Sequence, residues 1–371
     1  MRINSIDLHD FRNHKDLTLG FPVGVSAIIG RNGRGKTNIV EAVNYCAILG
    51  SHRSAQDAPL IRRECEEATV TAHVQKHERK ATMSVTIKSV GANKVSLNGN
   101  TLTRPRDILG LVQTVIFSPE DLDLVKGDPS ARRKYIDEFS TLLTPRFAGI
   151  RLEYERALKQ RNSLLKSSGR RELSSSAQET LLAWDEQLIK HGSELVSQRL
   201  SALKELENHI SEHGQTISGD TEPLSATYHS TWLNKESTSI DEVALDLREQ
   251  LAARQTQEIE RGLTLVGPHR DDLELNLSGI SAKSYASHGQ CWSIALALRL
   301  ATFSVLREHD DDPILILDDV FAELDQRRRI RLQEAICDVE QTLITAAVKE
   351  DLPNSLEFQE ILLDDGDLNV G

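Results

Sequence analysis

Aromatic residues are scarce in this 371-residue chain, at 4%, and cysteine and methionine are scarcer, with four and two residues. The cysteines lie far apart in the sequence, at Cys46, Cys65, Cys291 and Cys337, and none belongs to a Cys-x-x-Cys pair. This spacing argues against a disulfide framework and against a zinc site. We expect reduced cysteines with mainly structural roles.

Long apolar runs are missing as well. No run approaches the roughly 20 apolar residues that span a bilayer. The first residues, MRINSIDLHDF, lack the basic and apolar regions of a signal peptide. We therefore expect a globular, cytoplasmic protein with no membrane partner. An apolar content of 39% in a chain of this length can form the cores of two or three domains.

The net charge of −12 is unevenly distributed along the chain. Residues 305–371 hold 18 acidic and 6 basic residues, so the preceding 304 residues sum to zero. Within 131–171 there are 11 Lys and Arg residues against 4 Asp and Glu, a local charge of +7. A neutral body with one basic and one acidic sector is compatible with DNA binding, although the composition alone does not predict it.

The start of the chain is predicted to form a nucleotide-binding unit. A strand ending in VSAIIG, a glycine loop and the helical segment NIVEAVNYCAIL follow one another within the first 50 residues. Alternating apolar residues at 70–74 and 83–87, with the hairpin signal Asn98-Gly99, then predict an antiparallel sheet.

The middle of the chain is predicted to be helical. Apolar residues near heptad spacing over 131–215 indicate helices, and the polar stretch 167–176 interrupts them. This pattern predicts an inserted arm with a polar tip, and an ordinary helical bundle is the alternative. Strand-like LTLVGP at 263–268 and LELNLSG at 273–279 follow, then the apolar helical stretch after ASHGQCW, and then PILILDDVFAELD. The expected domains are 1–130, 131–250 and 251–371.

The segment GRNGRGKT at 30–37 matches the phosphate-binding pattern G-x-x-x-x-G-K-[ST] and stands between a predicted strand and a predicted helix. Backbone N–H groups would surround the phosphates of ATP, Lys36 would reach the β and γ oxygens, and the Thr37 hydroxyl would ligate Mg²⁺. A chance glycine turn is the alternative. The nucleotide-binding residues predicted here are Gly30, Arg31, Asn32, Gly33, Arg34, Gly35, Lys36 and Thr37.

The segment ILILDDVFAELD predicts a strand of a parallel sheet, apolar on both faces, with two aspartates at its carboxyl end, where ligands of α/β proteins bind. Asp318 is predicted to hold the Mg²⁺ shell, and Asp319 to position or polarise the attacking water. With Lys36 they are the predicted catalytic residues. A strand that ends in two aspartates without a catalytic role is the alternative.

A second anion site is predicted at residues 286–292, ASHGQCW, in front of an apolar helix. A helix N-terminus carries unpaired N–H groups and the positive end of the helix dipole. One chain has no need of two phosphate sites for one nucleotide, so Ser287, Gly289 and Gln290 are predicted to contact the γ-phosphate bound by a second copy. In the alternative, Ser287 only caps its helix.

Several longer segments carry a resemblance to a known family. They are LHDFRNHKDLTLGF, GRNGRGKTNIVEAV, VIFSPEDLDLVKGDPSARRKYID, LVGPHRDDLEL, YASHGQ and LDDVFAELD. With them the chain resembles, over nearly its whole length, the ABC-type ATPases related to SMC proteins, and most closely their branch of bacterial DNA replication and repair proteins.

This resemblance implies an α/β fold, an ABC-type P-loop ATPase head split between the chain ends, with an antiparallel β subdomain and an inserted helical arm. It implies an ATP-dependent homodimer with slow, DNA-stimulated hydrolysis that serves as a switch. It also implies binding of single-stranded, gapped and linear double-stranded DNA. The implied partners are RecO and RecR, with which such a protein helps to load RecA on gapped DNA and to induce the SOS response.

Further roles follow from the same resemblance. Asp325 would be the aspartate of the D-loop, and Glu120 would have a metal-side or coupling role. The chain departs from the family where Cys291-Trp292 replaces the usual Gln-Arg, and where no histidine follows QTLITAAV. The first departure puts part of the signature's contacts with a second copy in doubt.

Other polar residues are open to two interpretations. Arg12 would stack near the nucleotide base or form a surface salt bridge, and His269, Arg270 and Asp271 would order a dimer face or form a local ion-pair cluster. Basic residues of the middle segment would follow DNA phosphates or lie on a solvated helix face. They are Arg132, Arg133, Arg151, Arg156, Lys159, Arg161, Arg170 and Arg171.

Two functions of other classes compete with a DNA-binding ATPase. An ATPase subunit of a transporter-like or other P-loop assembly would copurify with a membrane component. A P-loop kinase or small-molecule ligase, with Asp319 as a base, would transfer phosphate to an acceptor without stimulation by DNA. The Ser-x-Gly-Gln segment disfavours the kinase, which has no use for it.

Overall fold

The computed structural model describes residues 1–54, 56–167, 174–218, 223–309, 312–363 and 368–370. It divides into two compact units, which we describe separately. Unit 1 comprises Met1–Lys126, Asn208–Leu224 and Leu277–Gly371, and unit 2 comprises Gly127–Glu207 and Ser225–Asn276. The inserted unit thus begins at Gly127, close to the expected residue 131, and ends at Asn276, beyond the expected residue 250. Within it, Asn208–Leu224 belongs to unit 1.

A mostly parallel sheet forms the centre of unit 1. Its order is β15-β14-β3-β13-β12-β8, in which only the β14–β15 pair is antiparallel. Every residue of β8, β12 and β13 is buried, as expected of parallel strands covered on both faces. The strands are β3 Gly24–Ile29, β8 Thr114–Phe117, β12 Ile314–Asp318, β13 Gln341–Ala346, β14 Gln359–Leu363 and β15 Leu368–Val370.

The predicted antiparallel sheet is present in unit 1, with the order β2-β1-β4-β5-β6-β7. The Asn98-Gly99 hairpin is confirmed, and both residues have positive φ, 50° and 81°, as a type I′ turn requires. The strands are β1 Arg2–Phe11, β2 His14–Gly20, β4 Glu67–Lys76, β5 Arg79–Lys88, β6 Lys94–Leu97 and β7 Asn100–Thr101.

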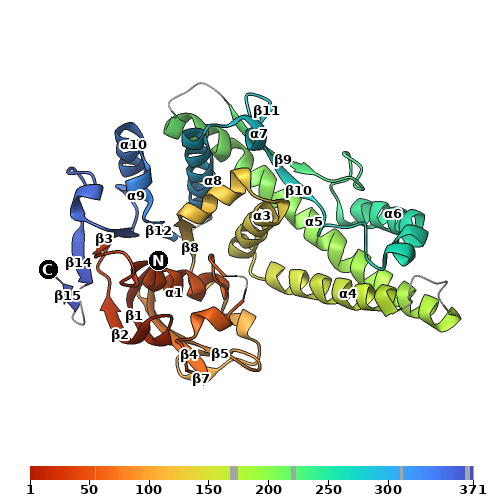
Figure 1. The fold of residues 1–371 in the computed structure, drawn as a ribbon, viewed down its shortest axis with the longest axis horizontal. Coiled ribbons are helices and arrows are strands. Elements are labelled where there is room, and N and C mark those ends of the chain that lie inside the picture. Colours follow the sequence, from red (N-terminus) through yellow and green to blue (C-terminus); the bar gives the residue numbers. More distant parts are fainter. Residues whose placement is uncertain (55, 168–173, 219–222, 310–311, 364–367, 371) are drawn as a thin grey trace. The chain divides into compact units, whose positions relative to one another are not determined.

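Helix α1 (Lys36–Ile48) lies between the two sheets, as Figure 1 shows, while α8, α9 and α10 lie on the other side of the parallel sheet. One apolar core joins α1 to residues of both sheets. The other helices of unit 1 are α2 Leu122–Lys126, α7 Ala282–Tyr285, α8 His288–Glu308, α9 Val320–Glu323 and α10 Gln326–Ile336. Single 3₁₀ turns are η1 Ala58–Leu60, η2 Pro105–Ile108, η3 Pro119–Asp121 and η4 Lys349–Asp351.

Within the described residues, α8 is the one helix long and apolar enough to cross a membrane by length and composition. The sequence had led us to expect no such segment. However, 78% of its most apolar window is buried, and it packs against β8 and α2. Its apolar character therefore agrees with that of a core helix.

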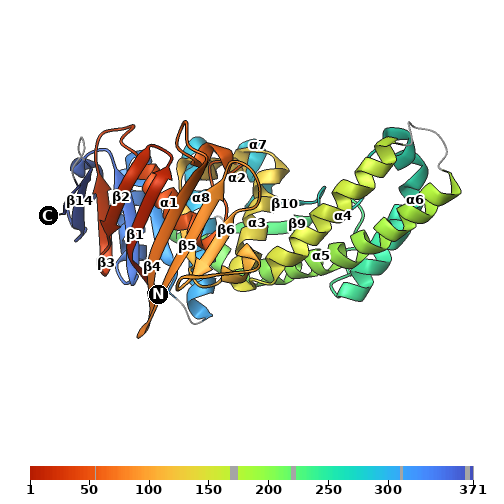
Figure 2. The same cartoon turned by 90° about the horizontal axis from the view of Figure 1, so that it is seen from below.

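Unit 2 is built mainly of helices, and Figure 2 shows α4, α5 and α6 running beside one another. They share one apolar core that includes Tyr154, Leu188 and Leu247, so the bundle alternative describes their packing. The helices are α3 Pro129–Leu143, α4 Phe147–Ser167, α5 Ser175–Ser218, whose last turns belong to unit 1, and α6 Ile240–Arg261. Unit 2 also contains the neighbouring strands β9 Leu224–His229 and β10 Asp272–Leu277, whose end residues Leu224 and Leu277 belong to unit 1, as does the next strand, β11 Ile280–Ser281.

Two local predictions for the middle of the chain have different outcomes. The interruption predicted at 167–176 falls mostly on residues 168–173, which lie outside the described residues; α4 is described up to Ser167 and α5 from Ser175. The strand at 263–268 is wrong. That stretch is irregular, and polar side chains satisfy its backbone in place of a neighbouring strand: the Thr264 N–H donates to Asn162 Oδ1 at 2.7 Å and the Leu265 N–H to Glu258 Oε1 at 2.6 Å.

Candidate nucleotide site

The glycine loop lies between β3 and α1, as the sequence predicts, and two of its glycines have left-handed backbone angles, Gly33 with φ 84° and Gly35 with φ 97°. Gly35 also has no room for a side chain, because a Cβ there would lie 2.5 Å from His14 Nε2. A Cβ on Gly30 would lie 2.7 Å from the carbonyl oxygen of Leu363. Each glycine is therefore required by backbone angle or by space.

Lys36 is held inside this loop. Its side chain is 4% exposed, and its Nζ donates to the carbonyl oxygen of Gly30 at 2.8 Å and to Asn32 Oδ1 at 3.4 Å. The ammonium thus occupies the centre of the loop before any ligand binds. Arg31, Asn32 and Gly33 are exposed and present the outer rim of the loop to solvent.

Asp318 stands at the carboxyl end of β12, beside Thr37. The Thr37 hydroxyl donates to Asp318 Oδ1 at 3.0 Å, and the Thr345 hydroxyl donates to the same oxygen at 2.6 Å. Burial raises the pKa of Asp318 to about 6, the neighbouring charges of Asp319 and Glu120 add to the rise, and the two hydroxyl bonds oppose it. A cation at Asp318 would relieve this burial of charge.

The donor set fits Mg²⁺. One carboxylate and one hydroxyl 3.0 Å apart are oxygen ligands, and Mg²⁺ in nucleotide sites takes one or two protein ligands together with phosphates and waters. Among the described residues no group of three or more His, Cys, Asp or Glu side chains could hold a metal. A metal held by Thr37 and Asp318 would therefore need further ligands from the nucleotide and from water.

Thr345 was not recognised from the sequence. It pairs with Asp318 across β12 and β13, its hydroxyl lies 3.4 Å from Asp319 Oδ1, and it accepts the Asp319 N–H at 2.9 Å. Asp319 has a φ of 53°, a left-handed angle that aspartate tolerates better than most residues. Thr345 thus orients both carboxylates. It lies near the end of β13, the strand that no histidine follows in this chain.

The buried charge of Asp318 leads to a prediction for the nucleotide-free protein. Because its folded-state pKa lies above the ordinary 3.8, its contribution to stability is present below pH 3.8 and is lost as the pH rises through about 6. Asp318→Asn, neutral at every pH, is therefore expected to raise the free energy of unfolding at pH 7 by about 2 kcal/mol. Nucleotide binding should lose its dependence on Mg²⁺.

Thermal unfolding of wild type and Asp318→Asn at pH 4.5 and pH 7, without nucleotide, measures this difference. The melting temperature of the variant should exceed that of wild type at pH 7, and the gap should shrink at pH 4.5. Equal melting temperatures at pH 7, with Mg²⁺ dependence retained, would contradict both the buried charge and the metal assignment.

The second predicted phosphate site is the N-terminus of α8, where Ser287 is the N-cap. Its hydroxyl accepts from the Gln290 N–H at 3.3 Å, and the Ser287 N–H donates to Gln290 Oε1 at 2.9 Å, which together form a capping box. The N-cap interpretation is thus realised within one chain. Ser287 is also exposed, which leaves its outer side open to a ligand.

Cys291 and Trp292, which depart from the family pattern, are 2% and 3% exposed. Burial raises the pKa of the Cys291 thiol, and the Trp292 ring packs edge-on against Phe117 with ring centroids 5.6 Å apart. Both side chains fill the core of unit 1. They are therefore not placed to make polar contacts with a second copy.

The predicted D-loop residue Asp325 is the N-cap of α10 and binds Arg328, which was not predicted. Arg328 Nη1 forms an ion pair with Asp325, and its Nε donates to Ser293 Oγ on α8 at 2.8 Å. A Cβ on Gly289 would lie 3.3 Å from the two Nη atoms. Gly289 therefore also makes room for an arginine that joins α10 to α8.

Arg12 forms a salt bridge, as one of its two interpretations has it, but with a buried partner and not at the surface. Its Nε and Nη2 donate to both carboxylate oxygens of Glu41, at 2.9 and 2.7 Å, and its Nη1 donates to Pro59 O at 2.9 Å. Glu41 lies on α1 and its side chain is fully buried. Arg53 lies 3.7 Å from Glu41 Oε2 and 3.5 Å from Glu120 Oε1, so it connects α1 to the turn that carries Glu120.

The family profile described as RecF/RecN/SMC N terminal domain matches residues 2–366. A protein described as DNA replication and repair protein RecF, from Streptomyces avermitilis, is 44% identical over 372 residues, covering 99% of each chain. Its counterpart in Kineococcus radiotolerans is 45% identical and covers 96% of this chain and 95% of its own. The chain belongs to the RecF family.

Solved structures agree with this placement in the RecF family. The recombination mediator protein RecF with ATP, described as part of the RecFOR pathway, matches with a TM-score of 0.90 at 30% identity, covering 99% of this chain and 97% of its own. An SMC head bound to the C-winged helix domain of ScpA matches with a TM-score of 0.55 at 16% identity, which shows a common fold alone. The predicted P-loop ATPase head with a helical insertion is confirmed.

The basic residues of unit 2 do not act as one surface. Arg161 is fully buried, and its Nε and Nη2 lie 2.6 and 2.7 Å from Asp185 and Glu258. Arg132 is 4% exposed and lies 2.7 Å from Asp272. Both interpretations of these two arginines, contact with DNA phosphates and a solvated helix face, are wrong, because acidic partners hold them in the interior.

Arg156 and Lys159 are exposed on α4, whereas Arg151 lies 3.6 Å from Glu155 of the same helix. Arg133 is partly buried and donates to the carbonyl oxygen of Asp271 at 2.8 Å. Arg170 and Arg171 lie outside the described residues. Among the basic residues that the sequence singled out, Arg156 and Lys159 are therefore exposed candidates for DNA contact in the described part of the chain.

His269, Arg270 and Asp271 make contacts within unit 2. Burial lowers the pKa of His269 to about 4, and its Nδ1 lies 2.7 Å from the Tyr154 hydroxyl. Asp271 is 1% exposed and accepts from the Tyr228 hydroxyl at 2.7 Å and the Trp232 indole at 2.8 Å. A local polar cluster therefore describes these residues, although hydroxyl and indole groups replace the expected ion-pair partners of Asp271.

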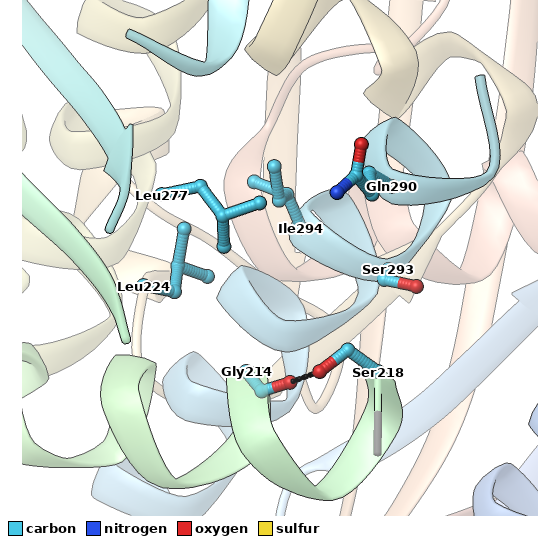
Figure 3. Close-up of a pocket in the computed structure, with 7 residues that line it drawn as sticks. All are labelled: Gly214, Ser218, Leu224, Leu277, Gln290, Ser293 and Ile294. Carbon is cyan, nitrogen blue, oxygen red and sulfur yellow. Dashed lines mark hydrogen bonds between the residues drawn. The ribbon is translucent and has the colours of Figure 1, made fainter. Parts of the chain in front are cut away.

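A small pocket lies beside the first turns of α8, where Figure 3 shows Leu224, Leu277 and Ile294 around it with Gln290 and Ser293 at one side. The residues that line it carry no charge. Phosphate sites in proteins use cations or several converging N–H groups. The lining therefore offers no charged side chain to an anion.

Proposed function

We propose that this chain is an ATP-dependent DNA-binding protein of recombinational repair and replication. ATP would bind at the glycine loop, join two copies, and increase their affinity for single-stranded, gapped and linear double-stranded DNA. Slow hydrolysis, stimulated by DNA, would release the complex. The observation that supports this most is that one chain carries a complete phosphate loop with its paired aspartates and, separately, an exposed capped helix N-terminus.

Within the ATP site, each residue has a distinct part. Lys36 would transfer its hydrogen bonds from Gly30 O and Asn32 to the β and γ oxygens, and the N–H groups of residues 30–37 would bind the phosphates. Thr37 and Asp318 would hold Mg²⁺, which supplies charge neutralisation on the phosphates. Asp319, oriented by Thr345, would position the attacking water.

The dimer would complete each site from two chains. Ser287, Gly289 and Gln290 of one copy would approach the γ-phosphate held by the other, with the dipole of α8 directed at the anion. Two copies related by a two-fold axis would then enclose two nucleotides. ATP would stabilise the dimer because the residues of one chain alone do not surround the γ-phosphate.

Light scattering after size exclusion tests this proposal. We expect a monomer without nucleotide and with ADP, and a dimer with a non-hydrolysable ATP analogue and Mg²⁺. Gapped DNA should comigrate with the dimer, and much less with the monomer that is nucleotide-free or bound to ADP. A protein that stays monomeric in every nucleotide state, or that never binds DNA, would exclude an ATP-switched DNA clamp for the isolated chain.

The DNA-binding part of the proposal predicts an effect of charge reversal on α4. Changing Arg156 and Lys159 to Glu should weaken binding to a gapped duplex, and should lower the slope of log affinity against log salt by about 2 for each chain engaged. Sequence preference should stay the same, because phosphate contacts do not read bases. Fluorescence anisotropy across a salt series measures both quantities.

A matched control is available at the β4–β5 hairpin, where Arg79 and Lys80 are exposed. Changing these two residues to Glu alters the net charge equally, and should leave the salt slope near that of wild type. If both double variants lose the same affinity, the effect comes from total charge. Unaltered affinity and slope in the α4 variant would remove this helix from the DNA face.

The proposed partners are RecO and RecR, and the proposed outcome is the loading of RecA on gapped DNA with induction of the SOS response, in the cytoplasm. Support comes from the matched RecF structures, which are described as parts of the RecFOR pathway. A direct test is the rate of RecA filament formation on gapped DNA with RecO and RecR present, measured with and without this protein.

A further inference from the structure

The segment SPEDLDLVKG at 118–127 contains a lysine that the proposed function has not used. Lys126 is the last residue of α2, and its Nζ donates to three main-chain carbonyl oxygens in and just after α7. The distances are 2.8 Å to Ala286 O, 2.9 Å to Lys283 O and 3.4 Å to Ala282 O. The ammonium group is thus fully engaged by the segment that leads into Ser287.

Helix α7 is a single turn, Ala282–Tyr285, in which the Ala286 N–H donates to Ala282 O at 3.0 Å. Lys126 adds donors to this carbonyl oxygen and to those of Lys283 and Ala286. A lysine ammonium offers three N–H donors and a positive charge, which suits a cluster of converging carbonyl oxygens. Bonds of this charge-assisted kind are stronger than bonds between neutral groups. Lys126 therefore acts as the C-terminal cap of α7.

The peptide between Ala286 and Ser287 is held on both sides. Its carbonyl oxygen accepts from Lys126 at 2.8 Å, and its N–H donates to Gln290 Oε1 at 2.9 Å. A peptide plane fixed at both polar atoms has little freedom to rotate. This restrains the position of the Ser287 Cα, and the bond from the Gln290 N–H to Ser287 Oγ at 3.3 Å restrains its side chain.

The other end of the 118–126 segment is attached to α8. Arg299 donates to Asp121 Oδ1 through Nη2 at 2.5 Å and through Nε at 3.1 Å, and Asp121 is 5% exposed. Between these two attachments, α2 packs against both α7 and α8. The 118–126 segment, which includes Glu120, is therefore bound at Asp121 to α8 and at Lys126 to the residues that precede Ser287.

We propose that Lys126 is a positioning residue for the site formed by two copies. It would hold Ser287 in the orientation that the γ-phosphate of the second copy requires. This inference rests on the proposed function, because it matters only if Ser287 acts on a nucleotide bound by another chain. It assigns Lys126 no part in nucleotide binding by its own chain.

The test compares Lys126→Met, which keeps most of the apolar stem and removes the donors, with Lys126→Arg, which keeps the charge and donors. Lys94→Met, an exposed lysine on β6, is the matched control. Fluorescent ATP analogue binding to dilute monomer should be unchanged in all three. Dimerisation with the same analogue, measured by light scattering, should weaken at least about tenfold in Lys126→Met alone.

Each result has a distinct meaning. Normal dimerisation of Lys126→Met beside a dimerising wild type would overturn this inference and leave the proposed function intact. Loss of monomer nucleotide binding in Lys126→Met, or failure of Lys126→Arg to restore dimerisation, would also overturn it, since a general effect on the fold would then explain the defect. A wild type that never dimerises would instead contradict the proposed function.

Discussion

Lys36→Met is expected to reduce ATP affinity by a factor of about 100 or more. The ammonium of Lys36 is buried in the loop with donors already directed at Gly30 O and Asn32, so it can turn to the phosphates without entering from solvent. Methionine keeps the apolar stem and removes every donor. Loss of two charge-assisted hydrogen bonds to phosphate accounts for about 3 kcal/mol or more, which is the stated change in affinity.

Titration calorimetry with Mg²⁺ and a non-hydrolysable ATP analogue measures this loss, with Lys94→Met as the control. The far-ultraviolet circular dichroism of Lys36→Met should match that of wild type, which separates a lost ligand contact from a lost fold. Dimerisation and ATP-dependent DNA binding should disappear with nucleotide binding. Affinity equal to that of wild type would refute the assignment of the phosphate loop.

Ser287→Arg is expected to abolish the ATP-dependent dimer while leaving monomer folding and ATP binding unchanged. Ser287 is exposed, so arginine fits in the single chain, but a bulky side chain would enter a packed contact between two copies. Loss of the N-cap hydroxyl destabilises α8 by about 1 kcal/mol. That loss is too small to unfold a core helix whose remaining residues are largely buried.

Two further substitutions separate the cap from the phosphate contact. Ser287→Asp keeps the cap, because aspartate caps helices as well as serine does, but it places a carboxylate against the γ-phosphate. Ser287→Ala loses the cap and adds neither bulk nor charge. We expect Ser287→Asp to lose the dimer in light scattering, and Ser287→Ala, which lacks the hydroxyl that Lys126 is proposed to position, to weaken dimerisation by at least about tenfold. Normal dimerisation of Ser287→Asp would leave the cap as the whole role of Ser287.

The phosphate loop and Asp318 could be placed from the sequence because each carries its structural context nearby. Gly30 to Thr37 stand between a strand and a helix in one short segment, and Asp318 ends an apolar strand. Their geometry follows from local rules for parallel sheets, in which ligands gather at the carboxyl ends of strands. Thr37 follows β3 and Asp318 ends β12, so their proximity could be expected once both strands were placed in one sheet.

Thr345, Arg328 and Lys126 could not be found in this way, since their roles depend on partners distant in the sequence. Thr345 acts on Asp318 through strand pairing, and Lys126 acts on carbonyl groups more than 150 positions away. A lysine or threonine has no sequence pattern that reveals a main-chain or carboxylate partner. Arg161 shows the reverse error, because a count of basic residues includes an arginine that Asp185 and Glu258 hold inside the protein.

The arrangement of strands around the phosphate loop constrains the order of events during synthesis. Strand β3, which leads into the loop, pairs only with β13 and β14, so that Gly24 lies beside Gln341 and Ser26 beside Gln359. At a translation rate of about 5 to 20 residues per second, β3 waits roughly 15 to 60 s for β13. Unit 2 lies between them in the chain and is complete by Asn276, so it can fold first. A nascent chain therefore acquires its ATP site late, after the segment proposed to bind DNA.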